Sequence, residues 1–307
     1  MNSVIFIGAS KLGRRCLSRL LDIPIIKLVG TVTAPRKFSI SYNKAGVKNV
    51  LHADVTQLCE DYNIPIATIT DAGMKDEALF ETVKSWNPDF FIVAGWYHMV
   101  PKNWRDLAPA YGLHASLLPD YSGGAPLVWA IINGEQETGI TFFQFAGGVD
   151  NGPIVGQAAT PIHEDDTIAT LYARIEELGL DLLDGYVPKL ADGSAVLTEQ
   201  DENQRRNMPQ RKPEDGEIDW NAPAQKIYDF IRAQTRPYPG AFFNWKDHKI
   251  HVWSARPLEG NGPAGMLRQI SGDLLVYCSD QRALQILEMS VDDTDISVDD
   301  FIKRYDV

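Results

Sequence analysis

The first 94 residues alternate between short apolar segments and segments with helical periodicity. Strand composition is found at Val4–Gly8, Ile25–Val32, Ile64–Ile69 and Pro88–Ala94. Between them, apolar residues recur every three or four positions, as on one face of a helix. Strands separated in this way predict an α/β fold with an open, doubly wound, mostly parallel Rossmann-like sheet. A sheet of this kind binds ligands outside the carboxyl ends of its strands.

The second part of the chain has a different pattern. The polar run Glu199–Arg206 interrupts the apolar periodicity and predicts a linker. Beyond it, short strands separated by glycine turns are predicted at Ala241–Trp245, Lys249–Ser254, Leu274–Tyr277 and Ala283–Met289. We therefore expect an α/β domain over residues 1–200 and a smaller, mainly β, OB-like domain over residues 207–307.

Composition argues against several classes of partner. The chain has 29 Lys and Arg against 41 Asp and Glu, a formal net charge of −12, whereas proteins that bind a nucleic acid backbone usually show a basic face. We therefore expect no nucleic acid partner. No apolar run reaches the roughly 18 residues of a membrane span, and no basic segment precedes the first apolar stretch. These features predict a cytoplasmic protein with no membrane partner.

No metal site is expected either. The chain has 3 cysteines, Cys16, Cys59 and Cys278. They lie far apart and lack the short spacing of zinc ligands. We therefore expect them to be core residues.

A histidine and an aspartate lie where strands are predicted to end. His114 begins the turn-forming segment His114–Pro119, and Asp150 lies in the glycine-rich segment Gly147–Gly152. A carboxylate beside an imidazole stabilises the protonated ring, which suits the pair for taking up and returning a proton near neutral pH. A core histidine and a turn-forming aspartate are the alternative interpretations. Taken together, the two residues predict a proton-transfer site.

Longer segments around this pair resemble a known family. They are HASLLPDYSGGAPLVWAIINGEQETGITFFQFAGGVDNGPIVGQ, IDWNAPAQKIYDFIRAQTRPYPGAFF and HVWSARPLEG. They resemble the formyltransferases that use 10-formyltetrahydrofolate, which include methionyl-tRNA formyltransferase and the sugar-nucleotide N-formyltransferases. The resemblance covers most of the chain. It implies that residues 1–200 form a formyltransferase catalytic domain with 10-formyltetrahydrofolate as co-substrate and no metal.

The resemblance also implies roles for individual residues. His114 would transfer the proton, and Asp150 would orient its ring. The folate would lie against three segments, which are Trp96, Tyr97 and His98; Ser116, Leu117, Leu118 and Pro119; and Ala146, Gly147, Gly148 and Val149. The family has an asparagine two residues before the histidine, and its carboxamide donates to the formyl oxygen as negative charge develops there. That catalytic position is Gly112 in this chain, and Ser122 replaces a family arginine.

The expected acceptor is a small-molecule partner, the amine of a nucleotide-linked amino-deoxysugar. Its phosphates need cations or helix N-termini, and Ser10, Lys11 and Lys44 are the candidate substrate-binding residues. From residue 201 onward the chain has 14 Lys and Arg against 18 Asp and Glu, a net charge of −4. A domain that binds tRNA should instead be basic.

Several alternatives stay open at this stage. A methionyl-tRNA formyltransferase would share the folate chemistry. A nicotinamide-dependent dehydrogenase would explain Gly8 and Gly13, although the full GxGxxG pattern is missing. A non-catalytic folate- or sugar-binding homologue would explain Gly112. In an active formyltransferase, Asn151 is instead a candidate replacement for the missing asparagine carboxamide. The oligomeric state is also open, with a homodimer among the options.

Overall fold

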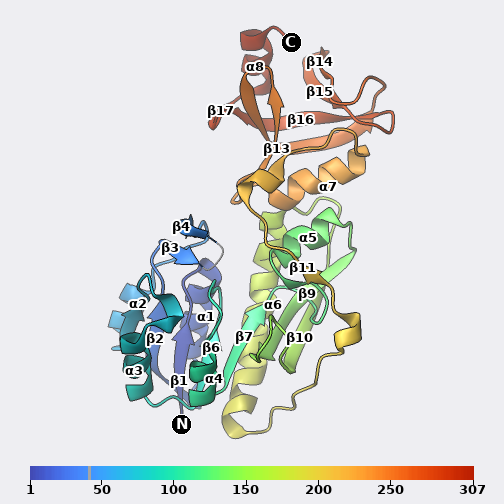
Figure 1. The fold of residues 1–307 in the computed structure, drawn as a ribbon. Helices are drawn as coiled ribbons and strands as arrows, with labels where there is room; N and C mark the ends of the chain where they lie inside the picture. The colour runs from blue at the N-terminus through green and yellow to red at the C-terminus, as the bar shows by residue number, and fades with distance from the viewer. Residues whose placement is uncertain (41–42) are drawn as a thin grey trace. The chain divides into compact units, whose positions relative to one another are not determined.

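The computed structural model describes residues 1–40 and 43–307 (Figure 1). The chain divides into two compact units. The first contains residues 1–123, 139–160 and 174–207, and the second contains residues 124–138, 161–173 and 208–307. The last boundary between units thus lies at the end of the predicted linker, while two short segments from the first 200 residues group with the C-terminal part. The limits of the two expected domains stay a prediction.

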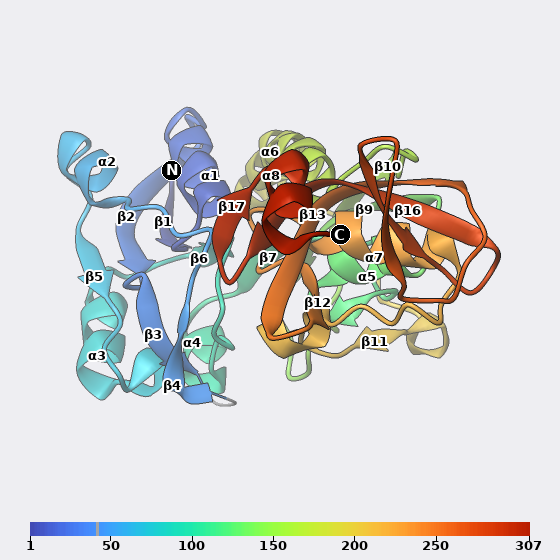
Figure 2. The same cartoon turned by 90° about the horizontal axis from the view of Figure 1, so that it is seen from above.

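A seven-stranded sheet forms the centre of the first unit. Its strands are β1 (Asn2–Ile7), β2 (Ile26–Thr33), β5 (Ile66–Thr68), β6 (Phe90–Val93), β7 (Ala110–His114), β9 (Glu137–Gln144) and β10 (Ile154–Pro161). Their order is β10-β9-β7-β6-β1-β2-β5 (Figure 2). The strands from β7 to β5 are parallel, and β9 is antiparallel to β7. The order reverses between β1 and β6, which confirms the predicted doubly wound, mostly parallel fold.

Helices cover both faces of this sheet. In Figure 2, α1 (Lys11–Leu21) and α6 (Ile168–Asp192) lie on one face, and α3 (Glu77–Ser85) and α4 (Lys102–Leu107) lie on the other. The helix α2 (Thr56–Asp61) precedes β5. On α1 the buried apolar residues Leu12, Cys16, Leu17 and Leu20 have helical spacing. The apolar residues that predict this helix are therefore also the residues that it buries.

Several short elements of the first unit have no clear sequence signal. They include the antiparallel pair β3 (Lys37–Ile40) and β4 (Asn43–Lys48). A second example is β8 (Ser122–Gly123), which pairs with β11 (Asn207–Met208) at the end of the predicted linker. Backbone hydrogen bonds define these pairs. The strands are only two to six residues long, and β8 and β11 are too short to show an apolar alternation.

The second unit contains an antiparallel sheet. Its strands are β12 (Ala241–Trp245), β13 (His248–Glu259), β14 (Leu267–Ile270), β15 (Asp273–Tyr277), β16 (Arg282–Val291) and β17 (Thr294–Ile296). The order is β12-β13-β16-β15-β14, and β17 also pairs with β16. The unit includes α5 (Pro126–Ile132), α7 (Ala224–Gln234) and α8 (Val298–Tyr305). The mainly β character predicted for the C-terminal part is confirmed.

A buried ion pair lies within α7. The Nε of Arg232 donates to Oδ1 of Asp229 at 2.7 Å, and both side chains are less than a tenth exposed. The same guanidinium donates to the carbonyl oxygens of Asp166 at 2.7 Å and His163 at 3.2 Å. Arg232 therefore fastens the segment before α6 to α7 within the second unit.

We expect Arg232→Met to lower the free energy of unfolding by about 3–5 kcal/mol, because it leaves the Asp229 carboxylate buried without its cation. The control is Arg19→Met, since Arg19 binds Asp184 at 3.3 Å with both side chains about two-fifths exposed. Breaking such a surface pair should cost at most about 1 kcal/mol. Urea denaturation measures both values. Equal, small losses would contradict a stabilising role for the buried pair.

Candidate active site

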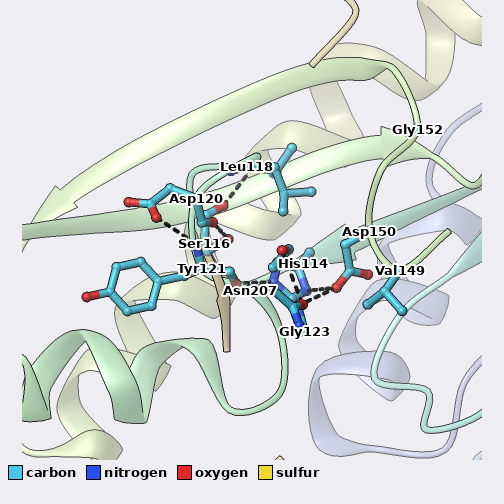
Figure 3. A network of polar contacts seen from close by, with 12 residues as sticks. His114, Ser116, Leu118, Asp120, Tyr121, Gly123, Val149, Asp150, Gly152 and Asn207 are labelled. Carbon is cyan, nitrogen blue, oxygen red and sulfur yellow. Dashed lines mark hydrogen bonds and ion pairs between the residues drawn. The ribbon is translucent and has the colours of Figure 1, made fainter. Parts of the chain in front are cut away.

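His114 is the last residue of β7, and its ring lies between two acceptors (Figure 3). Nδ1 is 3.5 Å from Oδ2 of Asp150, and Nε2 is 2.9 Å from the carbonyl oxygen of Tyr121. The side chain is only 12% exposed. Each ring nitrogen of His114 therefore faces one oxygen atom, a carboxylate oxygen at Nδ1 and a backbone carbonyl oxygen at Nε2.

Asp150 lies in the loop between β9 and β10. Its Oδ2 accepts a hydrogen bond from the backbone N–H of Gly123 at 2.9 Å and also faces His114 (Figure 3). The backbone φ of Asp150 is +50°, a left-handed conformation that Asp adopts more readily than most residues. The structure thus brings together the two residues that the sequence predicts as a pair.

The turn after His114 is supported by a buried threonine. Thr141 Oγ1 donates to the carbonyl of Ser116 at 2.6 Å and accepts from the N–H of Leu118 at 3.0 Å. Ser116 and Leu118 are buried, and the Leu118–Pro119 peptide bond is cis. Ser116 and Leu118 therefore help to shape the turn that leads to Tyr121. Folate contact by Ser116, Leu117, Leu118 and Pro119 stays a prediction.

Trp96, Tyr97 and His98 follow β6 and form an aromatic cluster with Phe38. The ring of His98 lies 5.0 Å from that of Phe38 and 5.4 Å from that of Trp96, centroid to centroid. Burial lowers the pKa of His98, which favours its neutral ring. Among residues 1–40 and 43–307, Nε1 of Trp96 and Nε2 of His98 are buried without a hydrogen-bond partner. Folate binding by Trp96, Tyr97 and His98 stays a prediction.

The predicted folate-binding loop Ala146–Val149 immediately precedes Asp150. Gly147 is exposed, and Val149 is about half exposed. The N–H of Gly148 donates to Oδ1 of Asn151 at 3.0 Å. The carboxamide oxygen of Asn151 therefore contributes to the loop itself.

The three candidate substrate-binding residues differ in their surroundings. Ser10 is buried, and its hydroxyl caps α1 by accepting from the N–H of Gly13 at 3.1 Å. Lys11 is the exposed first residue of α1. Lys44 belongs to β4, and its side chain lies outside the described part of the structure. Substrate binding by these residues stays a prediction.

Gly112, at the position of the family asparagine, lies directly against an aromatic ring. A Cβ placed there would lie 2.5 Å from the ring of Phe145 and 3.0 Å from the carbonyl oxygen of Val93. Phe145 follows β9, and sequence reasoning missed its role because it continues an ordinary apolar run. An aromatic ring thus occupies the space beside residue 112, two residues before His114.

An arginine lies beside Ser122, although Ser122 replaces the family arginine in the sequence. The backbone N–H of Ser122 donates to the carbonyl of Arg206 at 3.1 Å. The Arg206 guanidinium binds the carboxylate of Asp120 and lies 4.6 Å from the ring centroid of Tyr121. Sequence reasoning missed Arg206 because it lies in the polar run Glu199–Arg206.

Within the described residues, no group of three or more His, Cys, Asp and Glu side chains is arranged to hold a metal ion. None of the helices in residues 1–40 and 43–307 is long and apolar enough to cross a membrane.

Comparison with known families matches both parts of the chain. Residues 27–185 match the formyl transferase family, and residues 211–306 match the formyl transferase C-terminal domain. The chain belongs to the formyltransferase family. This result confirms the family and the enzyme class predicted from the sequence.

Individual relatives differ in the acceptor or the bound molecules that their descriptions give. A methionyl-tRNA formyltransferase from Citrifermentans bemidjiense is 32% identical over 292 residues, which are 94% of this chain and 89% of that protein. An N-formyltransferase from Helicobacter canadensis, solved with folinic acid and dTDP-3-aminofucose, has a TM-score of 0.69 at 15% identity and covers 93% of this chain and 99% of its own. The methionyl-tRNA formyltransferase from Clostridium thermocellum has a TM-score of 0.58 at 19% identity, with coverage of 97% and 100%. At these identities the solved structures show a shared fold.

Proposed function

We propose that this formyltransferase moves the formyl group of 10-formyltetrahydrofolate to the primary amine of a nucleotide-linked amino-deoxysugar. The transfer chemistry rests on the His114–Asp150 pair, with Nδ1 and Oδ2 3.5 Å apart at the end of β7. The folate supplies a formyl group on a nitrogen that can leave. Trp96 and His98, with their unsatisfied buried nitrogens, are the residues proposed to hold its pterin end.

His114 would move the proton that this exchange requires. The amine must be neutral to attack, it loses a proton as the new C–N bond forms, and the leaving nitrogen needs a proton. An imidazole can accept the proton that the amine loses and return it to the leaving nitrogen. Asp150 stabilises the charged ring between these events, and the Tyr121 carbonyl oxygen holds Nε2 until the substrate takes its place.

The acceptor is inferred from the charge of the C-terminal part, which has a net charge of −4 from residue 201 onward. Several of its arginines already bind partners within the second unit. Arg211 lies over the ring of Trp129, Arg232 binds Asp229, and Arg236 binds Asp295. A tRNA would need free cations along its backbone. Two phosphates of a nucleotide-sugar need only a few local donors.

Methionyl-tRNA formyltransferase is the second candidate, and sequence identity favours it. The relative from Citrifermentans bemidjiense carries that name at 32% identity over most of both chains. The two candidates share the folate chemistry and differ only in the acceptor.

We expect nucleotide-linked amino sugars, incubated with the protein and 10-formyltetrahydrofolate, to gain one formyl group, measured by mass spectrometry. Charged initiator tRNA should gain none at physiological salt. Sugar formylation should change little between about 50 and 200 mM salt, whereas tRNA binding through several phosphates would weaken by orders of magnitude. Formylation of the tRNA alone, with a steep salt dependence, would reassign the acceptor. Folate binding without transfer to either would indicate the non-catalytic alternative.

A further inference from the structure

Side chains of the predicted linker Glu199–Arg206 bind the backbone of the loop that carries Asp150. Gln200 donates its amide hydrogens to two carbonyl oxygens of this loop, at 2.8 Å to Asp150 and at 2.7 Å to Gly152. These two bonds fix the backbone on both sides of residue 151. Asp150 adopts a φ of +50°, a conformation that is maintained where neighbouring contacts offset its cost of about 1 kcal/mol or more.

Arg205 completes the same set of contacts. Its guanidinium donates to Oε1 of Gln200 at 3.0 Å and to the carbonyl oxygen of Val149 at 3.2 Å. Glu202 holds that guanidinium through bonds of 2.6 and 2.8 Å. The Arg205 side chain is only 16% exposed although it is charged. The carbonyls of Val149, Asp150 and Gly152 are therefore all bound by two side chains that also bind each other.

The position of Gln200 is set by a strand-like contact. Thr198 and Ile154 exchange two backbone hydrogen bonds of 2.7 and 2.8 Å, which places the chain after Thr198 beside the start of β10. A short 3-10 turn over Glu202–Gln204 then reverses the chain so that Arg205 returns to Gln200. The bridge at Thr198 and the turn after it therefore bring Gln200 and Arg205 to the same loop.

The side chain of Asp150 is fixed from the opposite direction. Its Oδ2 accepts from the N–H of Gly123 at 2.9 Å and faces Nδ1 of His114 at 3.5 Å (Figure 3). The carboxylate can meet the imidazole only if the backbone of residue 150 stays where Gln200 and Arg205 hold it. A displacement of about 1 Å in such a group can cost about 100-fold in rate.

We propose that Gln200 and Arg205 are positioning residues that hold the Asp150 loop so that its carboxylate faces His114. This inference rests on the proposed role of the His114–Asp150 pair in formyl transfer. Neither residue is required to touch the substrate or the folate. Their action is carried entirely by the backbone carbonyls of Val149, Asp150 and Gly152.

The direct test is Gln200→Glu, which keeps the size of the side chain and removes the two amide donors. We expect kcat for formyl transfer to fall about 10- to 100-fold, with the KM for the acceptor amine within about threefold of wild type. Gln136→Glu is the matched control, because Gln136 also donates its amide to a backbone carbonyl, that of Gly134 at 3.1 Å. Its kcat should stay within twofold. Equal kcat values for Gln200→Glu and wild type would overturn the proposal.

Arg205→Lys and Arg205→Ala separate positioning from folding. The lysine keeps a charged donor group but loses the planar fork of the guanidinium, and it should lose less activity than the alanine. Both variants should keep the wild-type thermal midpoint within a few degrees. In an Asp150→Asn background, Gln200→Glu should lower single-turnover transfer by less than threefold, since the carboxylate it positions is already absent. An undiminished 10- to 100-fold loss in that background would show that Gln200 acts elsewhere.

A spectroscopic measurement on the His114 ring tests the positioning role without requiring turnover. Long-range ¹H–¹⁵N spectra of the His114 ring report the hydrogen bonding of Nδ1. Gln200→Glu should shift the His114 Nδ1 resonance in the direction produced by Asp150→Asn, whereas Gln136→Glu should leave it unchanged. An unchanged resonance in Gln200→Glu contradicts the positioning role even if activity falls. Absence of transfer by the wild-type protein, with this shift present, would instead count against the proposed function alone.

Discussion

His114→Asn should abolish most formyl transfer while folate binding persists. Asparagine keeps a polar side chain of similar length but cannot accept a proton from the amine and return it to the leaving nitrogen. Loss of a general acid–base catalyst typically lowers the rate by about 10²- to 10⁴-fold. Single-turnover formylation measures the loss, and calorimetric titration with tetrahydrofolate measures binding, whose Kd should stay within about threefold of wild type.

A second histidine–aspartate pair supplies the matched control. His248 Nδ1 lies 2.7 Å from Oδ2 of Asp292 on the second unit, so His248→Asn removes the same kind of contact elsewhere in the chain. Its kcat should stay within twofold of wild type. If His114→Asn retains a tenth or more of wild-type turnover, His114 is not the proton carrier.

The main features of the fold could be predicted because they depend on apolar periodicity. The strands β1, β2 and β6 and the helix α1 bury the residues that their patterns mark. In the second unit, β12 and β16 follow the same rule. The position of His114 at a strand end could also be predicted, since the apolar turn that follows it ends at Pro119.

Side-chain contacts to backbone carbonyls could not be predicted in the same way. Gln200 and Arg205 lie in a polar run, and polar runs are typical of linkers. Their partners are carbonyls of the Asp150 loop, which leave no mark in the sequence. Thr141 and Phe145 were missed for the opposite reason. Both belong to the run Gly139–Phe145, whose β-pattern is explained by core packing alone.

The close approach of the Phe145 ring to Gly112 leads to the prediction with the second largest effect. Gly112→Asn alone should lower the free energy of unfolding by about 1–3 kcal/mol and should not raise kcat, because its Cβ would lie 2.5 Å from the Phe145 ring. Combining it with Phe145→Ala gives the carboxamide the space of the removed ring. We expect the double variant to exceed Gly112→Asn in kcat by at least tenfold, with an upper limit of about 10²- to 10³-fold for a well-placed oxyanion donor.

Gly112→Ala distinguishes steric from chemical effects, because it adds the Cβ without the carboxamide. Alone it should destabilise the protein as Gly112→Asn does, and with Phe145→Ala it should regain stability without gaining rate. Urea denaturation and single-turnover formylation are measured on the wild type and on five variants, which include Phe145→Ala alone. For each substitution at residue 112 they give one coupling energy for stability and one for the transition state. Additive effects on stability would show that Phe145 yields freely and does not exclude a side chain at residue 112. Coupling in stability without any gain in kcat would show that a carboxamide at residue 112 does not reach the formyl oxygen.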